Sequence, residues 1–122
     1  MRRFLALSSL AATIAAVTLL ASCGGESTAP PANSNKAVDV FTVNVAFSPN
    51  SVEIDAGDTV RFNIVPAANG EGHDVTFDAA PGVPANIKVT LNGVIARVFT
   101  TRGDFQYNCF VHPGMSGEIL VQ

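Results

Sequence analysis

The chain has 122 residues, with 7 Lys and Arg against 10 Asp and Glu, 2 His and 2 Cys, and a formal net charge of −3. This length leaves room for one folded domain once an export signal has been removed. The acidic balance argues against nucleic acid as a partner, because binding to phosphates requires a basic surface.

The N-terminus has the pattern of an export signal. Arg2 and Arg3 precede an apolar run over residues 4–20, which is followed by small residues ending in Cys23. This pattern predicts a cleaved signal rather than a membrane span of the mature protein. The sequence "LASC" at residues 20–23 resembles a bacterial lipobox, so we expect a lipoprotein signal peptide over residues 1–22 and lipidation of Cys23. An ordinary secretory signal with an incidental Cys is the alternative.

Residues 23–37 predict a flexible tether behind the lipidated Cys23. The sequence "GGESTAPPANSNKA" is small, polar and rich in Pro and Ser, so it cannot bury a core. Removal of residues 1–22 would also take away two basic residues and leave a net charge of about −5. We therefore expect an exported protein, held by lipid in the cell envelope at the periplasm or the outer cell surface, with its domain over residues 38–122.

Alternating apolar residues predict short strands in this domain. Two sets are expected to face the core: Phe41, Val43, Val45 and Phe47, and then Val60, Phe62 and Ile64. Asn92-Gly93 lies between the apolar segments 87–91 and 94–99, which predicts a β-hairpin. About eight short strands with no helical period favour an all-β fold, a Greek-key β-sandwich, with a small β-barrel as the alternative.

The sequence "NCFVHPGMSG" at residues 108–117 brings three metal-binding side chains together. Cys109 shares the parity of Tyr107, so it is expected to end a strand facing the core. His112 and Met115 follow in a loop that a Pro-Gly pair allows to turn tightly. A spacing of two residues between successive ligands lets all three side chains point toward one position.

His73, the other His of the chain, begins a predicted strand after the flexible sequence "PAANGEG". A sandwich can place the start of one strand beside the end of a strand from the opposite sheet, which would bring His73 to Cys109 and His112. An export compartment oxidises thiols, yet Cys109 has no disulfide partner if Cys23 carries lipid. A surface His, a buried Cys and a core Met are each common, but their joint occurrence in this pattern favours a metal site.

The chemistry of these side chains then indicates the metal. A thiolate, a thioether and two imidazoles suit copper, and this set describes a blue-copper site with a weak axial Met. Zinc could use the Cys and both His but has little use for the thioether. A thiol protease using Cys109 and His112 is disfavoured, because Cys109 faces inward and no oxyanion-hole motif is evident.

Residues 40–122 resemble a cupredoxin, a type 1 copper protein similar to plastocyanin and amicyanin. Three segments carry the resemblance: "FSPNSVEIDAGDTVRF", "GHDVTF" and "TTRGDFQYNCFVHPGMSGEILV". The Cys-x-x-His-x-x-Met spacing is most similar to amicyanin. Asp74 departs from the family, which often has after the first ligand an Asn that links to the Cys loop. A carboxylate there could lower the reduction potential or change its pH dependence.

The resemblance implies one copper ion per chain, bound by His73, Cys109, His112 and Met115. It also implies a monomeric electron-transfer protein, not an enzyme, whose redox partners dock transiently near His112, Val111 and Pro113. Two His in the whole chain are too few for the additional copper centres of a multicopper oxidase or a copper nitrite reductase. A copper buffer or delivery protein, or a purely structural sandwich on a lipid anchor, remains the alternative.

Overall fold

The computed structural model describes residues 35–122. The expected signal peptide, the expected lipid site at Cys23 and most of the expected tether lie outside the described residues. The first strand begins at Ala37, close to the expected start of the domain at residue 38. No helix within residues 35–122 is long and apolar enough to cross a membrane.

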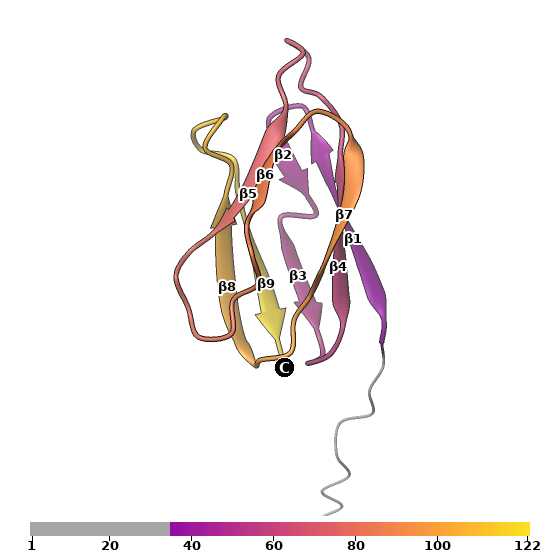
Figure 1. Ribbon diagram of the computed structural model, residues 1–122, viewed down its shortest axis with the longest axis vertical. Coiled ribbons are helices and arrows are strands. Elements are labelled where there is room, and N and C mark those ends of the chain that lie inside the picture. The colour runs from indigo at the N-terminus through magenta and orange to yellow at the C-terminus, as the bar shows by residue number, and fades with distance from the viewer. Residues whose placement is uncertain (1–34) are drawn as a thin grey trace, which may run out of the picture.

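The described residues form a sandwich of two β-sheets (Figure 1). The strands are β1 (Ala37–Val43), β2 (Ala46–Ser48), β3 (Ser51–Ile54), β4 (Thr59–Ile64), β5 (His73–Phe77), β6 (Ile87–Thr90), β7 (Gly93–Val98), β8 (Gly103–Asn108) and β9 (Ser116–Val121). One sheet has the order β2-β1-β4-β7 and the other β3-β9-β8-β5-β6. The predicted all-β sandwich is confirmed, and the two separate sheets replace the alternative of a closed barrel.

Both sheets mix parallel and antiparallel pairs. Strand β1 runs parallel to β4, and β3 runs parallel to β9, whereas the remaining neighbours are antiparallel. The predicted core face of β4 is confirmed, because Val60, Phe62 and Ile64 are fully buried. Across the parallel pair, Val40 lies opposite Phe62, so the two strands present the same face to the core.

The predicted core face of residues 41–47 is wrong for three of its four members. Phe41, Val43 and Val45 are about half exposed, and the inward positions of β1 are Val40 and Thr42. The buried Thr42 hydroxyl donates a hydrogen bond to the Val65 carbonyl (2.9 Å), which satisfies a polar group in the core. The fourth member, Phe47, is buried. It lies on β2, which begins after a two-residue turn, so its side chain does not follow the alternation of β1.

That turn explains the error in residues 41–47. Asn44 has a φ of 54°, in the left-handed region, and the turn pairs Val43 with Ala46. A single period of two therefore does not run through residues 41–47. The same turn creates β2 as a separate strand of three residues, which brings the total for the described residues to nine rather than about eight.

The predicted hairpin at Asn92-Gly93 is also wrong. Strand β6 pairs with β5, whereas β7 pairs with β4, so this turn connects the two sheets instead of two neighbouring strands. An Asn-Gly pair reverses or redirects the chain, but its local chemistry does not decide which strands then pair. Here Ile87 of β6 lies opposite Val75 of β5 and is buried with it.

An aromatic cluster fills the space between the sheets below the predicted ligand loop. Tyr107 on β8 contacts Phe47, Phe62 and Phe77 with ring centroids 4.9, 5.5 and 5.8 Å apart, in edge-to-face arrangements. Such pairs add about 0.5–1.5 kcal/mol each beyond the burial of their area. This packing fixes β5 and β8, the two strands that carry His73 and lead into Cys109.

Candidate metal centre

Neighbouring strands of one sheet bring the predicted ligands together. Strands β5 and β8 are antiparallel, with Thr76 opposite Asn108, so the start of β5 lies beside the end of β8. His73 is the first residue of β5, and Cys109 directly follows β8. The expectation that the two strands come from opposite sheets is wrong, because antiparallel neighbours within one sheet achieve the same juxtaposition.

Gly72 allows β5 to begin close to β6. A Cβ atom at this position would lie 2.6 Å from the Thr90 carbonyl oxygen, a distance that real Cβ atoms do not adopt. Thr90 is also the register partner of His73. The missing side chain at Gly72 therefore lets the His73 ring enter the interior directly after the loop.

The turn that carries His112 is closed by its own backbone. The Cys109 N–H donates to the Met115 carbonyl (2.9 Å), and the Met115 N–H donates to the His112 carbonyl (3.1 Å). Gly114 has a φ of 90°, which a residue with a side chain rarely adopts. These contacts confine residues 109–115 to a compact loop between β8 and β9.

The side chains of His73, Cys109 and His112 converge. The Cys109 Sγ lies 3.9 Å from His73 Nδ1 and 3.6 Å from His112 Nδ1, and the two imidazole rings have centroids 4.6 Å apart. One ligand atom from each residue lies within 4.8 Å of the others. The three residues are 0%, 3% and 7% exposed, so the cluster is shielded from water.

Met115 is buried at 2% exposure in the same closed loop. Its backbone hydrogen bonds tie it to both Cys109 and His112, the two other predicted ligands of the loop. Its role as an axial ligand stays a prediction, as does the assignment of His73, Cys109 and His112 as the strong ligands.

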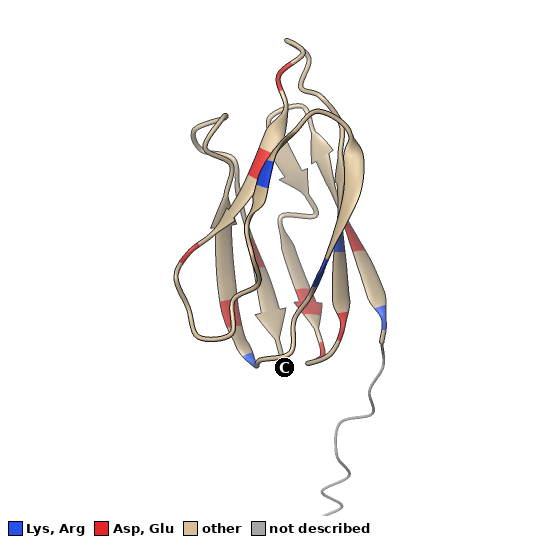
Figure 2. Ribbon diagram, viewed as in Figure 1, with Lys and Arg blue, Asp and Glu red and all other residues tan. Residues whose placement is uncertain are grey.

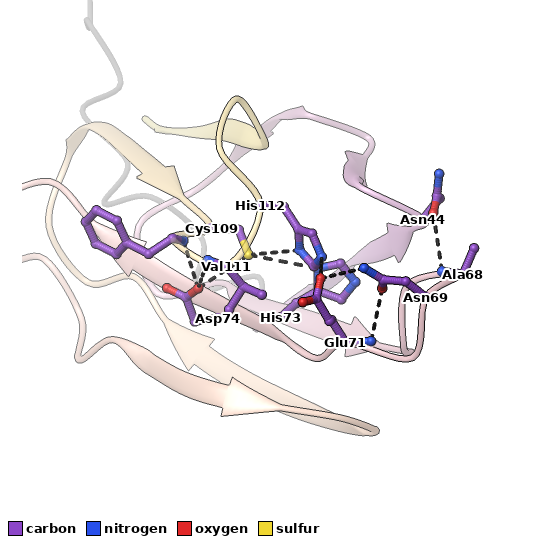
Figure 3. Close-up of polar contacts among 10 residues, drawn as sticks. Asn44, Ala68, Asn69, Glu71, His73, Asp74, Cys109, Val111 and His112 are labelled. Atoms are coloured by element: carbon purple, nitrogen blue, oxygen red, sulfur yellow. Dashed lines mark hydrogen bonds and ion pairs between the residues drawn. The ribbon is translucent and has the colours of Figure 1, made fainter.

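Asp74 anchors the ligand loop to β5 (Figure 3). Its Oδ1 accepts hydrogen bonds from the backbone N–H groups of Phe110 (2.8 Å) and Val111 (3.3 Å), and from the Cys109 thiol (3.3 Å). Its Oδ2 accepts a hydrogen bond from the Thr76 hydroxyl (2.9 Å). The family resemblance implied a link from this position to the Cys loop, and Asp74 makes that link with a carboxylate in place of the usual Asn.

Burial changes the acid–base behaviour of two predicted ligands. Desolvation lowers the pKa of His73, and the nearby His112 lowers it further, which favours the neutral imidazole that binds metals. Desolvation also raises the pKa of the Cys109 thiol. The thiol therefore keeps its proton without a metal, and metal binding must release that proton.

Glu71 and Asn69 were not among the predicted site residues. Glu71 Oε2 lies 3.3 Å from His112 Nε2, on the side of the ring opposite to Cys109 (Figure 3). Asn69 donates a hydrogen bond from Nδ2 to the same Oε2 (2.6 Å). Their position directly before His73 in "NGEGH" is the only sequence signal that could have pointed to them.

The spacing of the donor atoms fits a single ion. Two ligand atoms at about 2.1 and 2.3 Å from one ion, separated by tetrahedral or trigonal angles, lie about 3.6–3.8 Å from each other. The two distances between Nδ1 and Sγ, 3.9 and 3.6 Å, agree with that spacing. One thiol and two imidazoles are a donor set that suits copper.

A model of the family described as copper binding proteins, plastocyanin/azurin family, matches residues 35–122. The chain therefore belongs to this family of cupredoxins, and the predicted family is confirmed. The cluster of His73, Cys109 and His112, with Met115 beside it, fits a single type 1 copper site.

Solved structures with a similar fold include pseudoazurin from Methylobacterium extorquens AM1, at 24% identity and a TM-score of 0.56, over 70% of this chain and 75% of that chain. A reduced amicyanin variant matches at 25% identity and a TM-score of 0.57, over 70% of this chain and 82% of that chain. A copper-containing nitrite reductase from Thermus scotoductus SA-01 matches at 29% identity and a TM-score of 0.60, over 70% of this chain but only 22% of the nitrite reductase chain. A comparison with curated proteins finds no match.

Proposed function

We propose that this cupredoxin is a lipid-anchored carrier of single electrons outside the cytoplasmic membrane. The observation that carries the proposal is the buried cluster of one thiol and two imidazoles in a chain of a copper-binding family. Copper bound there supplies one-electron chemistry by cycling between Cu(II) and Cu(I). The anchor is lipid on Cys23, and the tether over residues 23–37 joins it to the domain.

The protein contributes a rigid and dry set of donors. The closed loop fixes Cys109, His112 and Met115 relative to one another, and the sheet fixes His73. Asp74 ties the loop to β5 through two backbone hydrogen bonds. Donors that are held in place before an electron arrives need little rearrangement when the charge of the site changes, which favours rapid transfer.

An electron carrier explains the ligands better than an enzyme does. Both His residues of the chain belong to the one cluster, so this chain offers none for a second copper centre. The likeness to the nitrite reductase covers only 22% of that protein. The part that the two proteins share is a fold of the cupredoxin type and not a whole enzyme.

The surface around His112 suits brief docking of a redox partner. The loop over residues 109–115 has no charged residue, and the Glu71 carboxylate beside His112 Nε2 comes from the neighbouring loop. Figure 2 shows many of the other charged positions along the strands and at the opposite end of the molecule. Phe110 is 75% exposed beside Val111 and Pro113, whereas His112 lies at the edge of the core. A partner can approach the apolar side chains of Phe110, Val111 and Pro113 without stripping water from charged groups of this loop.

Replacing Phe110 by Asp tests this docking surface without changing a proposed ligand. We expect the charge-transfer spectrum to be unchanged and the self-exchange of electrons between two copies to slow about tenfold, the typical cost of losing an interface anchor. Val98→Asp on β7 is the matched control, because Val98 is also exposed but lies in the other sheet, opposite Thr59 at the start of β4. Exchange could be measured from NMR line widths of partly oxidised protein.

Two outcomes would contradict the proposal. An unchanged exchange rate in Phe110→Asp, together with an intact spectrum, would mean that electrons leave through another surface. Loss of copper from the wild type to an added chelator during each redox cycle would favour the alternative of a copper buffer or delivery protein, because a carrier must hold its ion in both oxidation states.

A further inference from the structure

The outward nitrogen of His112 faces a carboxylate. His112 Nδ1 is directed at Cys109 Sγ, whereas His112 Nε2 lies 3.3 Å from Glu71 Oε2. The His112 side chain is 8% exposed, and the Glu71 side chain is 54% exposed. The half-exposed carboxylate therefore lies beside the buried Nε2 of His112.

Glu71 is held in this place by its own loop (Figure 3). Asn69 donates from its side chain to Glu71 Oε2 (2.6 Å), and the Glu71 N–H donates to Asn69 Oδ1 (3.1 Å). The Ala67 N–H donates to the Glu71 carbonyl (2.9 Å), and the Ala68 N–H donates to Asn44 Oδ1 (3.3 Å). An exposed glutamate normally samples many rotamers, but this one is restrained at both its backbone and its carboxylate.

Within the described residues, no Lys or Arg accounts for the position of this carboxylate. Within residues 35–122, Glu71 forms no ion pair with a Lys or Arg, and His112 is its only ion-pair partner. His112 Nε2 in turn has no well-aligned hydrogen bond. The buried His112 Nε2 therefore has Glu71 Oε2, which Asn69 restrains, as its polar neighbour.

The chemistry of imidazole gives this contact a consequence. A neutral imidazole that offers its Nδ1 lone pair to a metal carries its hydrogen on Nε2. A carboxylate at Nε2 accepts that hydrogen, fixes the ring orientation and makes Nδ1 a stronger donor. A stronger donor beside an added negative charge stabilises the more highly charged Cu(II) over Cu(I).

We propose that Glu71, restrained by Asn69, is a positioning residue that orients His112 and lowers the reduction potential of the copper site. The proposal rests on His112 being a copper ligand, as the proposed function requires. It assigns to the loop before β5 a role in setting the potential, in addition to its role in delivering His73.

Glu71→Gln tests the charge of this contact, and Glu71→Ala removes the contact altogether. Removing such a partner of a metal-bound His typically weakens metal binding about tenfold. If that loss falls on Cu(II) alone, the one-electron reduction potential of the copper site rises by about 59 mV. We expect the reduction potential to rise by this order in Glu71→Ala and by less in Glu71→Gln. In Asn69→Ala the potential should lie between those of the wild type and Glu71→Ala. Glu53→Gln on β3 removes a charge near the C-terminal Gln122 and should leave the potential unchanged.

A second measurement needs no copper. In ¹⁵N NMR spectra of the metal-free protein, we expect wild-type His112 to hold its hydrogen on Nε2, and Glu71→Ala to lose this preference between the two nitrogens. A folding defect would appear as a loss of dispersion throughout the spectrum, whereas the proposed role changes the His112 resonances and those of the adjoining loop.

The contradicting results separate this proposal from the ligand assignment. If His112→Ala loses the charge-transfer band but neither Glu71 variant changes the potential or the His112 tautomer, the positioning role of Glu71 is overturned. If His112→Ala keeps the full band, His112 is not a ligand, and both this proposal and the assigned copper site are wrong.

Discussion

Replacing Asp74 by Ala should loosen the ligand loop even when no metal is present. The carboxylate, 5% exposed, accepts the backbone N–H groups of Phe110 at 2.8 Å and Val111 at 3.3 Å. A hydrogen bond to a charged group contributes about 1.5–3 kcal/mol, and the longer contact counts at the low end. Because removing a buried charge also recovers part of its desolvation cost, we expect a net loss of about 2–3 kcal/mol.

Urea unfolding of the metal-free protein measures this loss directly. Asp74→Asn keeps one acceptor oxygen and should cost less, about 1 kcal/mol. Asp78→Asn is a matched control from the residue after β5. The exposed Asp78 side chain accepts only a 3.3 Å hydrogen bond from Asn108, so this change should alter stability by less than about 0.5 kcal/mol. If Asp74→Ala were as stable as Asp78→Asn, Asp74 would not be the anchor of the loop.

Three further predictions concern the axial ligand, the lipid anchor and the core. Met115→Leu should raise the reduction potential and Met115→Gln should lower it, both with copper retained, which voltammetry can measure. Loss of copper in both variants would show that Met115 holds the ion and is not merely a weak axial ligand. Wild-type protein should label with fatty acid and fractionate with membranes, whereas Cys23→Ala should do neither; an unlabelled, soluble wild type would contradict lipidation. Gly117→Ala would bring a Cβ within 2.4 Å of the Tyr107 phenol oxygen and 2.9 Å of the Asn50 carbonyl oxygen. Thermal unfolding should therefore show that the free energy of unfolding falls by about 2–3 kcal/mol. A variant as stable as the wild type would refute this tight packing.

Much of the site could be predicted from the sequence, because its ligands are spaced along short segments of regular structure. The parity that Cys109 shares with Phe105 and Tyr107 correctly predicted that Cys109 faces the core. The same alternation buries Ile119 and Val121 on β9. In these strands the period of two runs without interruption from the strand into the ligand position.

The errors lie where a turn or a choice of neighbour decides the outcome. Asn44 breaks the alternation in residues 41–47 through a left-handed turn that no hydrophobic pattern reveals. The Asn92-Gly93 turn is real, but sheet pairing is set by long-range packing. The link from Asp74 to the Cys loop was implied by the family resemblance, whereas the contact of Glu71 with His112 was not, since it joins residues more than thirty positions apart through the folded loop.

The central claim is that one type 1 copper site, built on Cys109, is the functional centre of this protein. A copper titration followed by visible absorption tests it most directly. We expect an intense thiolate-to-Cu(II) band that saturates at one copper per chain, disappears on one-electron reduction, returns on reoxidation and is absent from Cys109→Ser. An equally intense band in Cys109→Ser, or a wild-type protein that binds copper without this band, would contradict the account.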